Sequence, residues 1–314
     1  MRCSVIIPTL NAGEAIVPLL RTLKAQTHPP DEVLVVDSQS EDGTVDRARQ
    51  VEGVRVISVA REAFDHGGTR DEALRQTDGE FAVFLTQDAL PVDESCLAHL
   101  LEPFEDARVA VVGGRQIARP DARPFEKRVR AYNYPNVDRK WDQSDVGRMG
   151  VRAFLISNVC AAYRRTAYEA VGGFDHPILT NEDMLITQKL LEAGYAAAYS
   201  ARATVYHSHR LTWRQEYRRN ALIGRTLKRY QHRFCHAGEM KEGIALFRHV
   251  ESGLLRDGQL VEAVAFAANC AARLLGNRMG RMQEAEIVRM EQNADEHNER
   301  ANSVRSAQRR KAHP

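Results

Sequence analysis

The stretch Phe81-Ala82-Val83-Phe84-Leu85-Thr86-Gln87-Asp88-Ala89 decides the fold of this chain. Its first five residues form a short apolar run, which is typical of a strand buried on both faces of a parallel sheet. The run is closed by a carboxylate, Asp88, and Pro91 follows shortly after it. Open α/β sheets bind ligands beyond the carboxyl ends of their strands, so Asp88 lies where a ligand is expected.

Similar apolar runs lie on both sides of this stretch and alternate with helical patterns. This order predicts an α/β fold with a mostly parallel sheet and helices on both faces. The predicted strands of this part are residues 4–8, 32–36, 54–59, 81–85 and 109–112. Beyond Leu211 the pattern is helical and basic, whereas the part before it is mildly acidic. Such asymmetry suggests an attachment surface. The charged tail beyond Gln283 is either a solvated helix or disordered.

Composition sets broad limits on what the protein is. A chain of 314 residues is long enough for two domains, or for one large domain with an extension. The net charge of +2 predicts no polyanionic partner such as nucleic acid. Five cysteines without Cys-x-x-Cys spacing fit reduced thiols in a cytoplasmic protein better than disulfides or a zinc site. We expect no signal peptide, because only Val5-Ile6-Ile7 precedes Pro8, and this run is too short for an apolar h-region. We expect no spanning helix, because no apolar stretch reaches about 18 residues.

Five short motifs occur in one order and together are specific, although each alone is weak. They are Val5-Ile6-Ile7-Pro8-Thr9, Val35-Val36-Asp37-Ser38 with Asp42-Gly43-Thr44, Gly79-Glu80 before a strand that ends in an aspartate, Gly172-Gly173-Phe174-Asp175, and Glu182-Asp183. In this order they resemble the family 2 glycosyltransferases, over roughly residues 3–235. The resemblance implies a GT-A type, Rossmann-like sheet flanked by helices, with a C-terminal helical extension.

Further motifs resemble one branch of that family, the bacterial rhamnosyltransferases of surface-polysaccharide synthesis. They are Phe64-Asp65-His66-Gly67-Gly68-Thr69-Arg70, Leu85-Thr86-Gln87-Asp88-Ala89, and His207-Ser208-His209 with the basic helix after it. The chain departs from the family pattern at Asp71, where asparagine is usual, and at Thr86, where an acidic residue is usual. The second departure leaves one carboxylate in a motif that commonly has two.

The resemblance implies an inverting glycosyltransferase that moves a sugar, in the first place L-rhamnose from dTDP-rhamnose, to a glycan or lipid-linked acceptor in bacterial polysaccharide synthesis. Two alternatives stay open: the same fold with a UDP-sugar donor, and a non-catalytic nucleotide-sugar-binding scaffold. A dinucleotide oxidoreductase is disfavoured, because no GxGxxG motif follows the first strand. The implied parts are a nucleotide-sugar-binding half (1–112), an acceptor-binding half with the catalytic base (113–210) and a basic helical extension (211–314).

A hard cation such as Mg²⁺ or Mn²⁺ can neutralise a departing diphosphate through shared oxygen ligands. Asp88 is the candidate protein ligand. His207 and His209 are two residues apart, so on an extended segment they project to the same side. One of them can complete the metal shell, and the alternative is that both are structural.

The donor nucleotide is assigned by the resemblance to Asp37, together with Pro8 and Thr9. Gln87, which lies beside Asp88, is also expected to bind the donor. Arg70 is expected in the first turn of a helix, where it pairs with phosphate or with Asp88, or else lies on the surface without a role.

Asp183 is the predicted general base. A carboxylate near the first turn of a helix feels the positive end of the helix dipole. This position predicts a lowered pKa and an ionised side chain that can accept the proton of the acceptor hydroxyl. Glu182 would orient the acceptor or a neighbouring loop. The alternative is that both carboxylates only stabilise the helix.

The basic segment over residues 211–235 has three interpretations. It lies on anionic lipid with its aromatic side chains in the interface, it cradles the phosphates of a lipid-linked acceptor, or it is a solvated face with an aromatic core stripe. We therefore expect a cytoplasmic protein and keep open a peripheral contact at the inner face of the membrane. No recognised nucleic-acid motif accompanies the charge.

Overall fold

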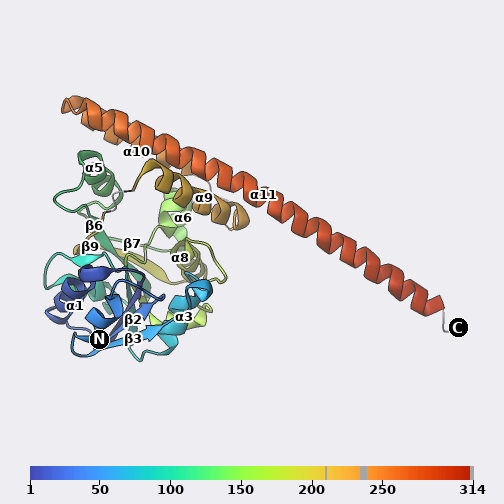
Figure 1. Ribbon diagram of the computed structural model, residues 1–314, viewed down its shortest axis with the longest axis horizontal. Helices are drawn as coiled ribbons and strands as arrows, with labels where there is room; N and C mark the ends of the chain where they lie inside the picture. Colours follow the sequence, from blue (N-terminus) through green and yellow to red (C-terminus); the bar gives the residue numbers. More distant parts are fainter. Residues whose placement is uncertain (209–210, 234–238, 312–314) are drawn as a thin grey trace. The chain divides into compact units, whose positions relative to one another are not determined.

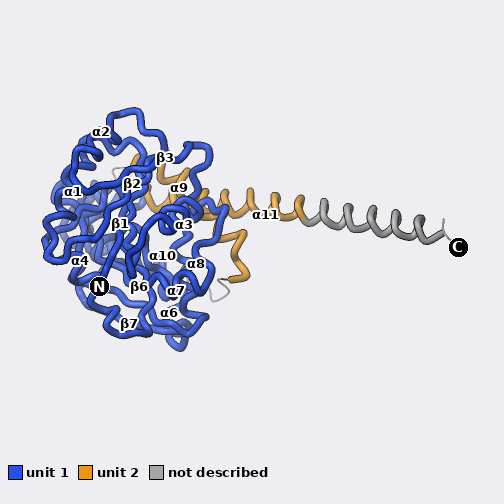
Figure 2. Tube along the Cα trace, turned by 90° about the horizontal axis from the view of Figure 1, so that it is seen from below, with its two compact units in different colours: residues 1–210, 236–267 blue, residues 211–235, 268–314 orange. Residues whose placement is uncertain are grey.

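The computed structural model describes residues 1–208, 211–233 and 239–311. Contacts divide the chain into two units, residues 1–210 with 236–267, and residues 211–235 with 268–314 (Figure 2). The break after residue 210 coincides with the predicted start of the extension, although residues 236–267 belong to the first unit. A strand over Val109–Ile117 crosses the boundary predicted after residue 112.

The first unit is built on one sheet. Its strands in the described residues are β1 (Cys3–Thr9), β2 (Glu32–Asp37), β3 (Val54–Ser58), β4 (Phe81–Leu85), β5 (Leu90–Pro91), β6 (Val109–Ile117), β7 (Arg139–Trp141), β8 (Cys160–Arg164) and β9 (Ala196–Tyr206). Their order is β3-β2-β1-β4-β8-β6-β9-β5, and β7 pairs with β9. Strands β1 to β4 are parallel, as the sequence predicts. The sheet as a whole is mixed, because β8 is antiparallel to both of its neighbours.

Helices cover both faces of this sheet. The helices of the described residues are α1 (Ile16–Lys24), α2 (Thr44–Arg49), α3 (Gly68–Arg75), α4 (Cys96–Leu101), α5 (Pro124–Asn133), α6 (Val146–Met149), α7 (Arg165–Ala170), α8 (Glu182–Glu192), α9 (Trp213–Arg229), α10 (Glu239–Arg256) and α11 (Leu260–Lys311). Apolar side chains of α1 and α4 join the core on one face. Helix α3 lies on the opposite side of the strands from α1 (Figure 1).

Strand β4 is buried over its whole length, as its apolar composition predicts. Successive side chains of a strand point to opposite faces. Val83 and Leu85 therefore join the core cluster with α1 and α4, and Phe84 faces the other way. There the Phe84 ring contacts Tyr163 and Phe174, with ring centroids 5.7 and 5.5 Å apart. Both faces of the strand that carries the Asp88 motif are thus held by packing.

The direction of the strands brings several chain segments to one edge of the sheet. Strand β6 is antiparallel to β8, and so is β4, which makes β6 parallel to β4. Strand β9 is parallel to β6. The carboxyl ends of β1, β2, β4, β6 and β9 therefore lie at the same edge, together with the amino end of β8.

The Gly172–Asp175 segment, which precedes α8, is anchored by Asp71. The Tyr168 hydroxyl donates a hydrogen bond to Asp71 Oδ1, and the Phe174 main-chain N–H donates to the same oxygen at 3.2 Å. His176 Nε2 lies 3.6 Å from Asp71 Oδ2. Asp71, where the chain departs from the family pattern, therefore fixes a loop from within the core.

In the second unit α9 and α11 touch backbone to backbone. A Cβ added at Gly276 or Gly280 of α11 would overlap the carbonyl oxygens of Tyr217 or Ala221 of α9. Near this contact the carboxylate of Glu284 is almost fully buried and pairs with Arg225, at 2.9 Å, and with Arg229. Of the two alternatives for the charged tail, the helix is the one present, since α11 continues to Lys311.

Every helix among residues 1–208, 211–233 and 239–311 is either too short or too polar to span a lipid bilayer.

Candidate active site

Asp88 and His207 meet at the shared sheet edge. Asp88 follows β4, His207 follows β9, and Asp88 Oδ2 lies 3.5 Å from His207 Nε2. The imidazole is buried, whereas the Asp88 side chain is 30% exposed. The other ring nitrogen of His207, Nδ1, lies 2.9 Å from Gln116 Oε1 and 3.0 Å from Arg130 Nη2. When Nδ1–H donates to Gln116, Nε2 presents its lone pair toward Asp88.

This pair fits a divalent cation. Two atoms that bind one small cation at about 2.1 Å each lie roughly 3 to 3.5 Å apart, which the distance between Asp88 and His207 matches. No group of three His, Cys, Asp or Glu side chains among the described residues could hold a metal. Phosphate and water oxygens would have to fill the other positions, as is usual for Mg²⁺. His209 lies outside the described residues, so its predicted role stays a prediction.

The predicted donor residues Pro8, Thr9 and Asp37 lie at the carboxyl ends of β1 and β2, and Thr9 is paired with Asp37 in register. The buried Asp37 carboxylate accepts hydrogen bonds from Ser40 N at 2.8 Å, from Ser40 Oγ at 2.5 Å and from Thr9 Oγ1 at 3.3 Å. Asp37 therefore has a structural function in the turn after β2, whatever it does for a nucleotide.

Gln87 ties the end of β4 to the end of β1. Its Oε1 accepts from the Leu10 main-chain N–H at 2.8 Å, and its Nε2 donates to the Leu10 carbonyl at 3.1 Å. Both the oxygen and the nitrogen of the Gln87 side-chain amide are thus hydrogen-bonded to the main chain of Leu10. The contacts make Gln87 a support for the strand ends, and its contact with a donor stays a prediction.

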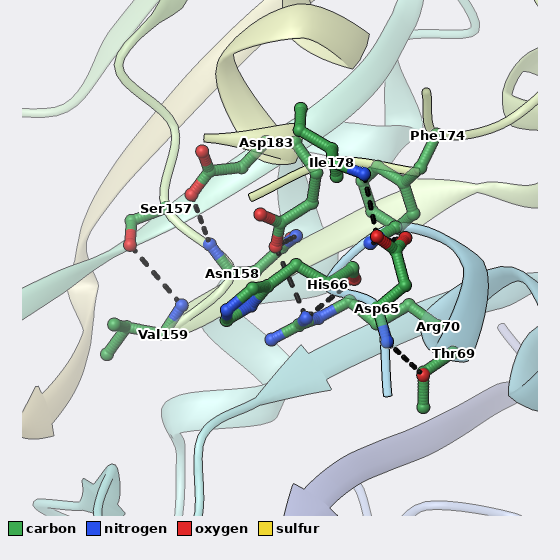
Figure 3. A network of polar contacts seen from close by, with 12 residues as sticks. Asp65, His66, Thr69, Arg70, Ser157, Asn158, Val159, Phe174, Ile178 and Asp183 are labelled. Atoms are coloured by element: carbon green, nitrogen blue, oxygen red, sulfur yellow. Dashed lines mark hydrogen bonds and ion pairs between the residues drawn. The ribbon is translucent and has the colours of Figure 1, made fainter. Parts of the chain in front are cut away.

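Arg70 lies beside Glu182 and not beside Asp88. Its Nη1 is 3.3 Å from Glu182 Oε1 and donates to the His66 carbonyl at 2.8 Å (Figure 3). The side chains of Arg70 and Glu182 are each only 6% exposed. Arg70 therefore does not form the ion pair with Asp88 that was one expectation. It is also not exposed on the surface without a role, which was the other alternative.

Asp183 is held by two backbone donors in the first turn of α8. Asn158 N donates to Oδ2 at 3.2 Å (Figure 3), and Met184 N donates to Oδ1 at 2.9 Å. Burial raises the pKa of Asp183 to about 7, and the charge of Glu182 acts in the same direction, against the Asn158 hydrogen bond and the Arg70 charge. The predicted lowering of this pKa is wrong, because burial outweighs the helix dipole. A pKa near 7 suits a general base.

Asn158 was not singled out by the sequence. It lies just before β8, and its Nδ2 donates to Glu182 Oε1 at 3.0 Å while its Oδ1 accepts from the Tyr163 hydroxyl at 2.9 Å. One residue thus contacts both members of the Glu182-Asp183 pair. Because Thr86 N donates to the Val159 carbonyl at 3.3 Å, Asn158 lies close to the strand end that carries Asp88. The only sequence signal was its position ahead of a buried strand.

His66 is a second residue that was quoted in a motif without a role. Its ring lies close to Arg70 in Figure 3. Burial lowers the pKa of His66, and the Arg70 charge adds to this against the opposing charges of Glu182 and Asp65. The imidazole is therefore neutral at pH 7 and adds no second cation beside the carboxylate pair.

Replacing Glu182 with glutamine is expected to move the acid limb of the kcat–pH profile to lower pH by roughly one unit. Removing the Glu182 charge lowers the pKa of Asp183, so a base stays ionised further into acid. Arg70→Met is expected to shift the limb the opposite way, because the Arg70 charge favours the ionised form. Glu192→Gln at the far end of α8 and Arg75→Met on α3 are the controls, since both side chains are exposed. Shifts of the same sign in both test variants would contradict this electrostatic arrangement.

The chain is similar in sequence to known glycosyltransferases. The model of the family described as Glycosyl transferase family 2 matches residues 4–172. The O-antigen chain rhamnosyltransferase RfbN of Salmonella typhimurium (strain LT2) is 38% identical over 220 residues, which is 70% of each chain. The O-antigen chain rhamnosyltransferase WbaN of Salmonella anatum is 38% identical over 218 residues, 69% of each chain.

Solved structures with the same fold are more distant in sequence. The mannosyltransferase PcManGT from Pyrobaculum calidifontis superposes with a TM-score of 0.62 at 20% identity, covering 90% of this chain and 87% of that one. Residues 1–349 of S. aureus TarS superpose with a TM-score of 0.53 at 18% identity, covering 90% and 93%. The chain belongs to glycosyl transferase family 2, and it is a glycosyltransferase with the GT-A fold.

Proposed function

We propose that this enzyme transfers L-rhamnose from dTDP-rhamnose, with inversion, to a glycan or lipid-linked acceptor in bacterial polysaccharide synthesis. The observation that carries the proposal is a single sheet edge that holds the Asp88–His207 pair next to the Asn158 backbone, which binds Asp183. The choice of rhamnose is supported by the two relatives that are named as O-antigen chain rhamnosyltransferases.

In the proposed reaction Asp183 takes the proton of the acceptor hydroxyl. The hydroxyl oxygen forms a bond to the anomeric carbon while the bond from that carbon to the diphosphate oxygen breaks. The main-chain N–H groups of Asn158 and Met184 hold the base in one orientation, and Asn158 and Arg70 hold the neighbouring Glu182. Asp88 and His207 would hold Mg²⁺ or Mn²⁺, which when bound neutralises charge on the leaving diphosphate.

A UDP-sugar donor is the second candidate. The solved neighbours are described as complexes with GDP-Man and Mn²⁺ and with UDP-GlcNAc. Both ligands are nucleotide sugars, which supports the donor class without selecting the base. The Thr9–Asp37–Ser40 cluster would lie toward the nucleoside, at the ends of β1 and β2.

A donor screen tests the proposal. Release of nucleoside diphosphate is followed for dTDP-rhamnose and for UDP- and GDP-sugars, each with and without Mn²⁺. We expect the fastest release from dTDP-rhamnose and a strong decrease when EDTA removes the cation. Faster release from a UDP-sugar would favour the second candidate, and no release from any nucleotide sugar with acceptor lipid present would contradict the proposed activity.

We also propose that the basic segment 211–235 contacts anionic lipid through α9. Arg225 and Arg229 are paired with Glu284, but Arg218 and Arg219 are exposed and Trp213 is 59% exposed. Exposed arginines with an aromatic residue suit an anionic membrane surface. Co-sedimentation with vesicles rich in anionic lipid should be lost in Arg218→Glu/Arg219→Glu, and unchanged binding by this variant would refute the contact.

A further inference from the structure

Arg119 is fixed beside the Asp88–His207 pair by the backbone. It follows β6, whose Ile117 carbonyl accepts from His207 N at 2.9 Å. The Arg119 main-chain N–H donates to Ser208 Oγ at 3.1 Å. These contacts join the ends of β6 and β9, so the position of Arg119 follows from the sheet.

The guanidinium of Arg119 reaches the main chain of Asp88. Its Nη2 donates to the Asp88 carbonyl oxygen at 2.9 Å, and the side chain is half-buried. This is the one hydrogen bond that the guanidinium makes with the described residues, and none of their carboxylates pairs with it. A guanidinium has five N–H donors in a planar fork that matches phosphate oxygens. The other N–H groups of the guanidinium therefore have no hydrogen-bond acceptor among the described residues.

Two arginines lie close to the Asp88–His207 pair. Thr86 stands where a second carboxylate is usual, so the 86–88 motif contributes one negative charge. Arg119 lies on the Asp88 backbone and Arg130 lies 3.0 Å from the His207 ring. A diphosphate carries two or more negative charges, and a partly desolvated cation interacts with it strongly.

We infer that Arg119 binds the diphosphate of the donor directly and carries part of the charge of the leaving group. The inference rests on the proposed function and adds to it a residue that none of the sequence motifs contains. In this arrangement the arginine supplies positive charge at a motif that has one metal-binding carboxylate. A purely structural Arg119 would hold the Asp88 loop without distinguishing a diphosphate from a monophosphate.

Titration calorimetry with nucleotides separates these roles. Whichever of dTDP, UDP and GDP binds the wild-type enzyme most tightly is compared with its own monophosphate, at saturating Mg²⁺ and fixed salt. Arg119→Gln keeps a donor for the Asp88 carbonyl but removes the charge. We expect it to weaken diphosphate binding roughly ten- to hundredfold and monophosphate binding less than about threefold. Arg119→Lys, which keeps the charge without the fork, should fall between the two.

The matched control is Arg123→Gln, because Arg123 is exposed and pairs with Glu262 at 3.1 Å. It should bind both nucleotides like the wild type. Wild-type diphosphate affinity in Arg119→Gln, or equal losses for both nucleotides, would overturn the inference and leave the proposed function intact. If the wild-type enzyme bound no nucleoside diphosphate, the proposed function itself would fail, and the inference with it.

Discussion

Asp183→Asn is expected to lower kcat by about 10²- to 10⁴-fold, which is the usual contribution of a general base. Asparagine has nearly the same size but cannot accept the proton of the acceptor hydroxyl. The side chain contacts Asn158 and Met184 and has no contact with Asp88 among those described. Affinity for the nucleoside diphosphate should therefore change little, so that the loss appears in kcat.

Steady-state rates of diphosphate release and calorimetric nucleotide affinities measure the two quantities. Glu192→Gln is the control for a lost carboxylate on the same helix, because Glu192 is exposed at the far end of α8. It should retain wild-type turnover. If Asp183→Asn kept kcat within about threefold of the wild type, the assignment of the base would be wrong.

Asp88→Asn is expected to reduce kcat/KM by about 100-fold and to raise the Mn²⁺ concentration needed for half-maximal activity. An amide is a weaker ligand for a hard cation than a carboxylate, and Asp88 supplies the negative charge of its motif. His207→Ala should act in the same direction, since Nε2 lies 3.5 Å from Asp88 Oδ2. Activity measured across a Mn²⁺ titration gives both values.

Asp93→Asn is the matched control, because Asp93 is exposed in the same loop region and its carboxylate accepts a hydrogen bond from the nearby Ser95 main-chain N–H at 2.8 Å. Its Mn²⁺ dependence should equal that of the wild type. An Asp88→Asn enzyme with unchanged Mn²⁺ dependence would show that the cation, if one acts, is held elsewhere.

The parallel half of the fold could be predicted because each apolar run there is followed by a helical pattern, which requires a crossover. The direction of β8 could not. A buried strand has the same apolar character whichever way it runs, and its direction depends on which neighbours it pairs with. The antiparallel pairing of β8 with β4 and β6 is what brings Asn158 to the sheet edge. The contact of Asn158 with Asp183 could therefore not be predicted from the sequence.

Asp88 could be located from the sequence because a polar residue at the end of a buried strand has a fixed place in an α/β sheet. The pKa of Asp183 could not be predicted, because the helix position is local whereas burial depends on the whole fold. The Arg70–Glu182 ion pair could not be predicted for the same reason. These residues lie on α3 and α8, far apart in the sequence, and only tertiary packing brings them together.

In the proposed function, the sheet edge at Asp88 receives the diphosphate of a nucleotide sugar. The most direct test of this binding is a crystal structure of the enzyme soaked with Mn²⁺ and the nucleoside diphosphate that it releases, with anomalous scattering used to locate manganese. We predict one manganese peak in contact with Asp88 and His207, and diphosphate oxygens bound to that ion. A nucleotide bound with its diphosphate away from both residues would contradict the account.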